Sequence, residues 1–219
     1  MIVVVGLPAY ADSPDGERCA GGMAVEAAAA AKLHGSQVEL VGKVGEDGAG
    51  DAVVLALGRL GIGHAALLRD PLRPTPVLTA GSVVGDDSAE VDADTPAATM
   101  LPANPTERPV LDAADIDLAL RYLPHASVIV LMDPVPDGAL AVAADAAAFA
   151  TARLIVVVPA GSSPPEVSAE ATVLEAPSDD DGSFGRLVGT FAAALDVGTE
   201  PAAAFREAIT ASGWESAPD

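Results

Sequence analysis

The sequence predicts an α/β fold, a doubly wound and mostly parallel sheet with helices on both faces. Two observations lead to this prediction. Short segments rich in Val, Ile and Leu alternate along the chain with alanine-rich segments of helical length. The apolar segments, such as VIVLM and IVVV, lack the alternation typical of a half-exposed strand, so both faces of these strands are expected to be buried. A parallel sheet between two layers of helices satisfies both observations.

The apolar and alanine-rich segments define the expected elements. The expected strands cover residues 2–6, 37–45, 65–70, 76–84, 127–133, 154–160 and 171–176. The expected helices cover residues 22–34, 48–60, 112–123, 137–151, 185–197 and 200–211. The residues that suit helix ends are Asp112 and Asp137 as N-caps, Pro201 in a first turn, and Gly35, Gly61 and Gly198 as C-caps.

The chain has 219 residues, which predicts one large domain. We assign this domain to residues 1–213 and expect a flexible tail at 214–219. Half of the residues are hydrophobic but only 3% are aromatic, so the core is expected to consist mainly of Ala, Val and Leu. Residues 85–109 are rich in Pro and acidic residues and are expected to form an irregular loop, either a substrate flap or a surface excursion.

The formal net charge of −21, with 11 scattered basic residues, makes nucleic acids and anionic membranes poor partners. No apolar run approaches the ~20 residues of a membrane helix, and the first residues lack the basic region of a signal peptide. A single cysteine and three scattered histidines exclude an internal disulfide and an imidazole cluster. These features predict a cytoplasmic protein without a membrane segment.

Residues 21–51 carry the most specific pattern in the chain. They contain a Gly-Gly turn, an alanine-rich helix, a strand and the segment VGKVGEDGAG. This arrangement resembles the N-terminal signature of the ribokinase-like (PfkB) carbohydrate kinases, and the segments PTPV (74–77), LPAN (101–104), 112–136 and LIVVVPAG (154–161) continue in family order. The matching signature positions are Gly21, Gly22, Ala24, Ala28, Gly35 and Gly45. The resemblance implies the ribokinase-like version of the predicted sheet.

Two regions depart from the family pattern. Residues 7–20 leave too little chain for the strands that form the family's substrate lid and its usual dimer contact. Residues 171–184 run directly into a helix, where the family has further strands that contact the nucleotide. We therefore expect the lid strands and part of the nucleotide-binding region to be reduced.

The resemblance also implies a site for a sugar or nucleoside. The family's asparagine, which contacts sugar hydroxyls, falls on Glu26, a residue that can still accept hydrogen bonds. Gly21 and Gly22 would let the ligand approach the backbone, and Asp12, near the end of the first strand, would contact the sugar. In the alternative interpretation Gly21 and Gly22 form only a tight helix entry, and Glu26 complements the helix dipole.

Several other residues have a structural interpretation. The glycine-rich residues 42–50 are expected to link a strand to a helix rather than bind phosphate. Asn104 is expected in a turn, and the three histidines at element ends are expected to be solvated or capping. Cys19 lies near the expected site but has no neighbour in sequence that would activate its thiolate.

Residues 179–185, DDDGSFG, precede an apolar helical segment and raise the question of a phosphate site. Gly182 and Ser183 would direct backbone N–H groups at an anion, an interaction of roughly 0.3–1 kcal/mol. Each upstream carboxylate opposes a phosphate by about 1 kcal/mol at ~4 Å in water. Asp179 and Asp180 would therefore need to bind Mg²⁺. In the alternative interpretation, Asp180 or Asp181 caps the helix.

The family's GAGD motif falls on residues 182–185, so its catalytic aspartate coincides with Gly185. Asp181 is the one carboxylate beside this turn that could replace it as general base. The lost aspartate favours a degenerate family member that acts as a small-molecule-binding, regulatory or assembly protein. The alternative is an active kinase that uses ATP and Mg²⁺ to phosphorylate a hydroxyl of a sugar or nucleoside. No cofactor is assigned to the first alternative, and a homodimer remains open because a shortened sheet leaves an edge to be covered.

Overall fold

The computed structural model describes residues 1–12, 18–78, 108–132, 138–163, 165, 167, 171–177 and 182–212. Several sequence predictions lie outside these residues. They are the second half of the strand at 76–84, nearly all of the loop at 85–109 with Asn104, the N-cap at Asp137, the residues Asp179, Asp180 and Asp181, and the tail at 214–219.

A parallel sheet forms the centre of the described structure. Its strands run in the order β5-β4-β1-β7-β8-β9, and every neighbouring pair is parallel. Their bounds are Ile2–Val5 (β1), Val38–Gly45 (β4), Leu67–Asp70 (β5), Val128–Leu131 (β7), Arg153–Val158 (β8) and Thr172–Glu175 (β9). Six of the seven predicted strands therefore lie in this sheet. The fold class predicted from the sequence is confirmed.

Helices cover both faces of this sheet. Their bounds are Met23–Leu33 (α1), Gly48–Arg59 (α2), Ala113–Arg121 (α3), Ala139–Ala150 (α4), Ser183–Asp196 (α5) and Pro201–Ser212 (α6). All lie within two residues of the predicted ends, and Asp112 forms a reciprocal capping box with Asp115 at the start of α3. The predicted C-cap glycines Gly35, Gly61 and Gly198 have φ angles of 89°, 67° and 90°.

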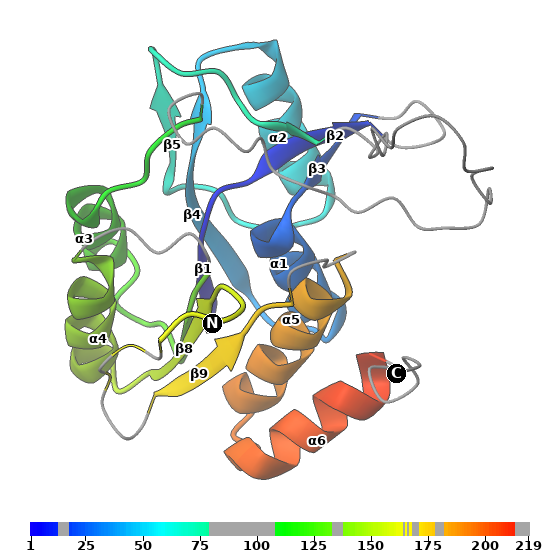
Figure 1. Ribbon diagram of the computed structural model, residues 1–219, viewed down its shortest axis with the longest axis vertical. Coiled ribbons are helices and arrows are strands. Elements are labelled where there is room, and N and C mark those ends of the chain that lie inside the picture. The colour runs from blue at the N-terminus through cyan, green and yellow to red at the C-terminus, as the bar shows by residue number, and fades with distance from the viewer. Residues whose placement is uncertain are drawn as a thin grey trace.

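Strand β1 shows why the predicted strands lack alternation. All four of its residues are at most 1% exposed. Ile2 and Val4 contact the core beneath α1 and α5, whereas Val3 and Val5 contact the core beneath α3 and α4. Figure 1 shows α3 and α4 on one side of the sheet and α1, α5 and α6 on the other.

A second, small sheet stands beside α2, and the sequence analysis did not foresee its first two strands. An antiparallel hairpin of β2 (Ala9–Asp12) and β3 (Arg18–Gly21) pairs through β2 with β6 (Val77–Leu78). Residues 7–20 thus hold β2 and the first three residues of β3, so short strands stand where the sequence predicted a reduced lid. The lid is reduced, as predicted, but it is present.

Hydrogen bonds of Asp47 connect this small sheet to the main one. Its carboxylate caps α2 by accepting from the Gly50 N–H at 2.8 Å, and it also accepts from the N–H and the hydroxyl of Thr75 at 2.8 and 2.7 Å. The Thr75 hydroxyl in turn accepts from the N–H of Gly45, the last residue of β4. Since Thr75 lies just before β6, these bonds fix the start of the third lid strand. Residues 42–50 link β4 to α2, as expected from the sequence.

The same contacts determine the ionisation of Asp47. Burial raises the pKa of Asp47. The hydrogen bonds from Gly50 and Thr75 and the Arg69 guanidinium together lower it by more, so the pKa lies below its ordinary value of 3.8. A carboxylate with a lowered pKa stabilises the folded state at pH values above 3.8 and loses this contribution as the pH falls through its folded-state pKa.

We predict that Asp47→Asn lowers the free energy of unfolding by about 1–3 kcal/mol near neutral pH, because donors of Gly50 and Thr75 lose a charged acceptor. The difference from the wild type should shrink once the pH falls below 3.8. Urea denaturation over a pH series measures both effects. Asp51→Asn is the control, because Asp51 is 71% exposed and pairs only at the surface with Arg69. An equal loss in both variants, or a pH-independent loss in Asp47→Asn, would contradict the prediction.

No helix among the described residues has the length and apolar character required to cross a membrane.

Candidate functional site

The strand order of the main sheet locates the expected ligand site. The order reverses at β1, with β4 and β5 on one side and β7, β8 and β9 on the other. In open α/β sheets, ligands bind outside the carboxyl ends of the strands at such a reversal. Gly6 follows β1 and Met132 follows β7 at this point. A Cβ atom at Gly6 would lie only 2.8 Å from the Cβ of Ala24, so the first turn of α1 borders the reversal.

Gly21 and Gly22 form the junction between the lid and α1. Gly21 is the last residue of β3 and pairs with Ala9 of β2. Gly22 is the N-cap of α1 with φ of 95°, and its carbonyl accepts from the N–H groups of Val25 and Glu26. The positive φ favours glycine at this position. The structure thus supports the structural part of the sequence interpretation, and contact of these glycines with a ligand stays a prediction.

Helix α5 runs parallel to α1, and the two N-termini lie side by side. Gly182 is the N-cap of α5 in the left-handed conformation, with φ of 90°, and Ser183 is the first helical residue. A Cβ atom at Gly182 would lie 3.3 Å from Cγ of Glu26. The two halves of the predicted site therefore meet in the folded chain.

An ion pair joins these halves. Arg186 donates to Oε2 of Glu26 at 3.4 Å, between residues separated by 160 positions in the sequence. Their side chains are 50% and 36% exposed, so we assign this pair at most about 1 kcal/mol. The Arg186 guanidinium also reaches the α5 N-terminus, since its Nη1 would lie 3.2 Å from a Cβ at Gly182.

Arg186 is not among the site residues predicted from the sequence. It is the only basic residue between Arg153 and Arg206, and it follows the position of the family's catalytic aspartate directly. A lone cation at this place in so acidic a chain is a signal that could have identified it.

Gly185, on which the resemblance places the family's catalytic base, lies against the backbone of α1. A Cβ atom there would come within 2.9 Å of both the Cβ of Glu26 and the carbonyl oxygen of Met23. One turn later, a Cβ atom at Gly189 would overlap the backbone of Ala27. Glycine permits this close approach of two helices because it has no side chain. The space that a side chain at this position would need is therefore occupied by α1.

The structure does not gather every predicted site residue. Asp12 lies at the end of β2, paired with Arg18, whereas Gly21 lies at the opposite end of the same hairpin, about 10 Å away along the strand. The sequence predicted Asp12 near the end of the first strand, but the structure places it at the end of β2, on the lid. Asp179, Asp180 and Asp181 lie outside the described residues, so their proposed metal and base roles stay predictions.

The described residues do not fit a metal ion on their own. In the part of the chain that the structure covers, no group of three or more His, Cys, Asp or Glu side chains lies close enough together to hold one. Cys19 donates to the carbonyl oxygen of Ala11, and His34 contacts the Thr190 hydroxyl at 3.3 Å where α1 ends. His34 and Cys19 thus have structural contacts.

Comparison with solved structures shows that the fold is ribokinase-like. The protein named Sa239 matches with a TM-score of 0.70 and 15% identity, over 100% of this chain and 94% of that chain. The ribokinase of Giardia lamblia matches with a TM-score of 0.64 and 17% identity, over 97% and 94% of the two chains. The Arabidopsis thaliana ribokinase, complexed with ribose and ATP, matches with a TM-score of 0.62 and 16% identity, over 96% and 90%. Comparison of the sequence with protein-family models and with curated protein sequences finds no match.

The crowding at Gly185 leads to a prediction about stability. Gly185→Ala should lower the free energy of unfolding by about 1–3 kcal/mol, because the added methyl group meets the backbone of α1. Gly48→Ala, at the first position of α2, is the control, since nothing lies within 4 Å of a Cβ there. Chemical denaturation of both variants measures the difference. Equal stability of Gly185→Ala and the wild type would show that α1 and α5 are further apart than described.

Proposed function

We propose that this protein keeps the ribokinase-like scaffold but has lost phosphoryl transfer, and that it acts as a cytoplasmic small-molecule-binding, regulatory or assembly protein. The observation that supports this proposal best is the close packing of Gly185 against α1. Its Cβ position lies within 2.9 Å of the Met23 carbonyl oxygen, so no longer side chain fits there without displacing α1.

Phosphoryl transfer to a hydroxyl group depends on a general base. Phosphorylation of an alcohol requires that a base take the hydroxyl proton, and such assistance contributes roughly 10²–10⁴ in rate. The base must come within hydrogen-bond reach of the substrate hydroxyl. Gly185 has no side chain that could accept a proton. The neighbouring Glu26 carboxylate is paired with Arg186. We infer that the ion pair holds Glu26 as a hydrogen-bond acceptor for a ligand.

The ligand that suits this place is a polyhydroxyl compound such as a sugar or a nucleoside. The Glu26 carboxylate accepts hydrogen bonds and lies in the first turn of α1, the helix that directly follows the lid strand β3. A triphosphate suits it less well. The chain carries a net charge of −21, which opposes polyanions.

The rival function is that of an active kinase. The similar structures include one described as a putative ribokinase II of E. coli in complex with ATP and Mg²⁺, at a TM-score of 0.64 and 13% identity. In this alternative ATP and Mg²⁺ are the cofactors, Asp179 and Asp180 hold the metal, Gly182 and Ser183 contact phosphate, and Asp181 is the base.

We predict that the wild-type protein transfers no labelled phosphoryl group from ATP and Mg²⁺ to any member of a panel of sugars and nucleosides. Calorimetry with the same panel should detect at least one ligand, and Glu26→Ala should weaken its binding about tenfold or more, a loss of about 1.4 kcal/mol. Glu207→Ala, an exposed acidic residue on α6, is the control for the change in charge.

A phosphorylated sugar or nucleoside that accumulates with the wild type would overturn the proposal. Asp181→Asn then decides whether Asp181 is the base, because it should abolish turnover in that case. If neither transfer nor binding occurs with any panel member, the ligand-binding part of the proposal is wrong.

A further inference from the structure

Helix α4 is unusually apolar for a helix at the surface. Among its twelve residues, Asp145 is the only polar one. Only Ala139, Ala143 and Ala147 are buried, in one stripe along the helix, and Phe149 is 83% exposed. A helix that is apolar all round is normally covered on more than one side. The outer surface of α4 is therefore a candidate interface.

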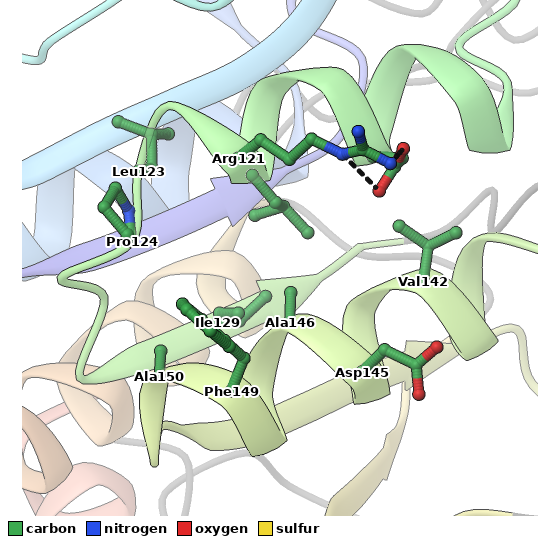
Figure 2. A pocket seen from close by; sticks show the side chains of 11 residues that line it. Arg121, Leu123, Pro124, Ile129, Val142, Asp145, Ala146, Phe149 and Ala150 are labelled. Carbon is green, nitrogen blue, oxygen red and sulfur yellow. Dashed lines mark hydrogen bonds and ion pairs between the residues drawn. The ribbon is translucent and has the colours of Figure 1, made fainter.

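A groove lies between α4 and α3. It has a volume of about 420 Å³, and Ile129 of β7 lines it together with side chains from both helices. Figure 2 shows Val142, Ala146 and Phe149 on the α4 side and Leu123 and Pro124 beyond the end of α3. Most of this lining is apolar, and its charged members are Asp117, Arg121 and Asp145. The apolar outer surface of α4 continues directly from the groove.

A second apolar groove flanks the other side of α3. Its volume is about 340 Å³, and it is lined by Ala66 and Leu68 at β5, by Leu118 of α3 and by Tyr122, the C-cap of α3. Leu118 is 53% and Tyr122 78% exposed. Large exposed apolar side chains that gather beside a groove, as Leu118 and Tyr122 do, are typical of interaction sites.

The charges around the α3–α4 groove are unequal. Asp117 and Arg121 on α3 form an ion pair at 2.6 Å and compensate each other. Asp145 on α4 has no cationic partner among the residues that the structure describes. The groove thus presents an apolar floor with one unpaired carboxylate at its rim.

We infer that the α3–α4 groove is the docking site for an amphipathic helix of another protein, one with an apolar face and a lysine or arginine that pairs with Asp145. Two adjacent helices form a groove into which a third helix packs. Recognition of such a helix by an apolar groove is a recurring mode of binding. The net charge of −21 adds a long-range attraction for a basic partner.

Two other occupants fit less well. A small ligand would fill the groove but leave the outer surface of α4 exposed over its twelve residues, about 18 Å. A second copy of this chain would bring its own net charge of −21 and its own Asp145 to a symmetric contact, where like charges repel. A basic helix meets neither difficulty.

The test uses two labelled synthetic helices of about 15 residues, long enough to be helical. Both carry leucines on one face; the first has lysines on the other face and the second has glutamates. Fluorescence anisotropy measures their binding to the full-length protein at low and at high salt. We expect the lysine peptide to bind, to bind more weakly at high salt, and to bind at least about tenfold more tightly than the glutamate peptide.

Four variants locate the site. Asp145→Lys should weaken binding of the lysine peptide about tenfold and improve binding of the glutamate peptide, whereas Glu207→Lys, the same change on α6 across the sheet, should leave both nearly unchanged. Phe149→Ala should weaken the lysine peptide, and Leu33→Ala, which removes an exposed side chain of α1 on the opposite face, should not.

Equal losses in Asp145→Lys and Glu207→Lys would show non-specific charge attraction and overturn the proposal. The same holds if neither peptide binds. Self-association of the wild type that Phe149→Ala abolishes would assign the groove to a second copy instead.

Discussion

The close contact between helices α1 and α5 is the constraint on which the candidate site depends. Gly185 and Gly189 lie against the backbone of Met23 and Ala27, and alanines fill most of the buried face of α1. Larger residues would hold the helix axes further apart. Because the helices run parallel, this contact brings their N-termini together at the reversal of the strand order. It thus brings the two halves of the predicted site together and leaves no space for a longer side chain at Gly185.

The same contact explains the charges at the site. Two parallel helices place two positive dipole ends side by side, which favours a carboxylate between them. Glu26 supplies it from the first turn of α1, and Arg186 pairs with it from α5. The ion pair between Glu26 and Arg186 thus crosses the interface between the two helices. In the function that we propose, Glu26 accepts hydrogen bonds from a ligand, and Gly185 supplies no acceptor for the proton that phosphorylation releases.

The sequence predicted the parts of this fold that depend on long apolar patterns. The buried strands lie where apolar runs predicted them, because burial on both faces of a strand favours a run of Val, Ile and Leu. All six helices lie where the alanine-rich segments predicted them. The lid strands AYAD and RCAG were missed, since they are short and show no alternation. The resemblance predicted a site at Gly22, Glu26 and Gly182, and the structure brings Glu26 and Gly182 close together. The crowding at Gly185 and the contact of Arg186 depend on the distance between two helices, which no local pattern encodes.

A crystal structure with a non-hydrolysable ATP analogue, Mg²⁺ and ribose at saturating concentrations tests the central claim most directly. We expect α1 and α5 to remain in contact through Gly185, with no phosphate on the N–H groups of Gly182 and Ser183. A terminal phosphate bound to these groups, with a sugar hydroxyl in line and a carboxylate within reach of it, would contradict the account.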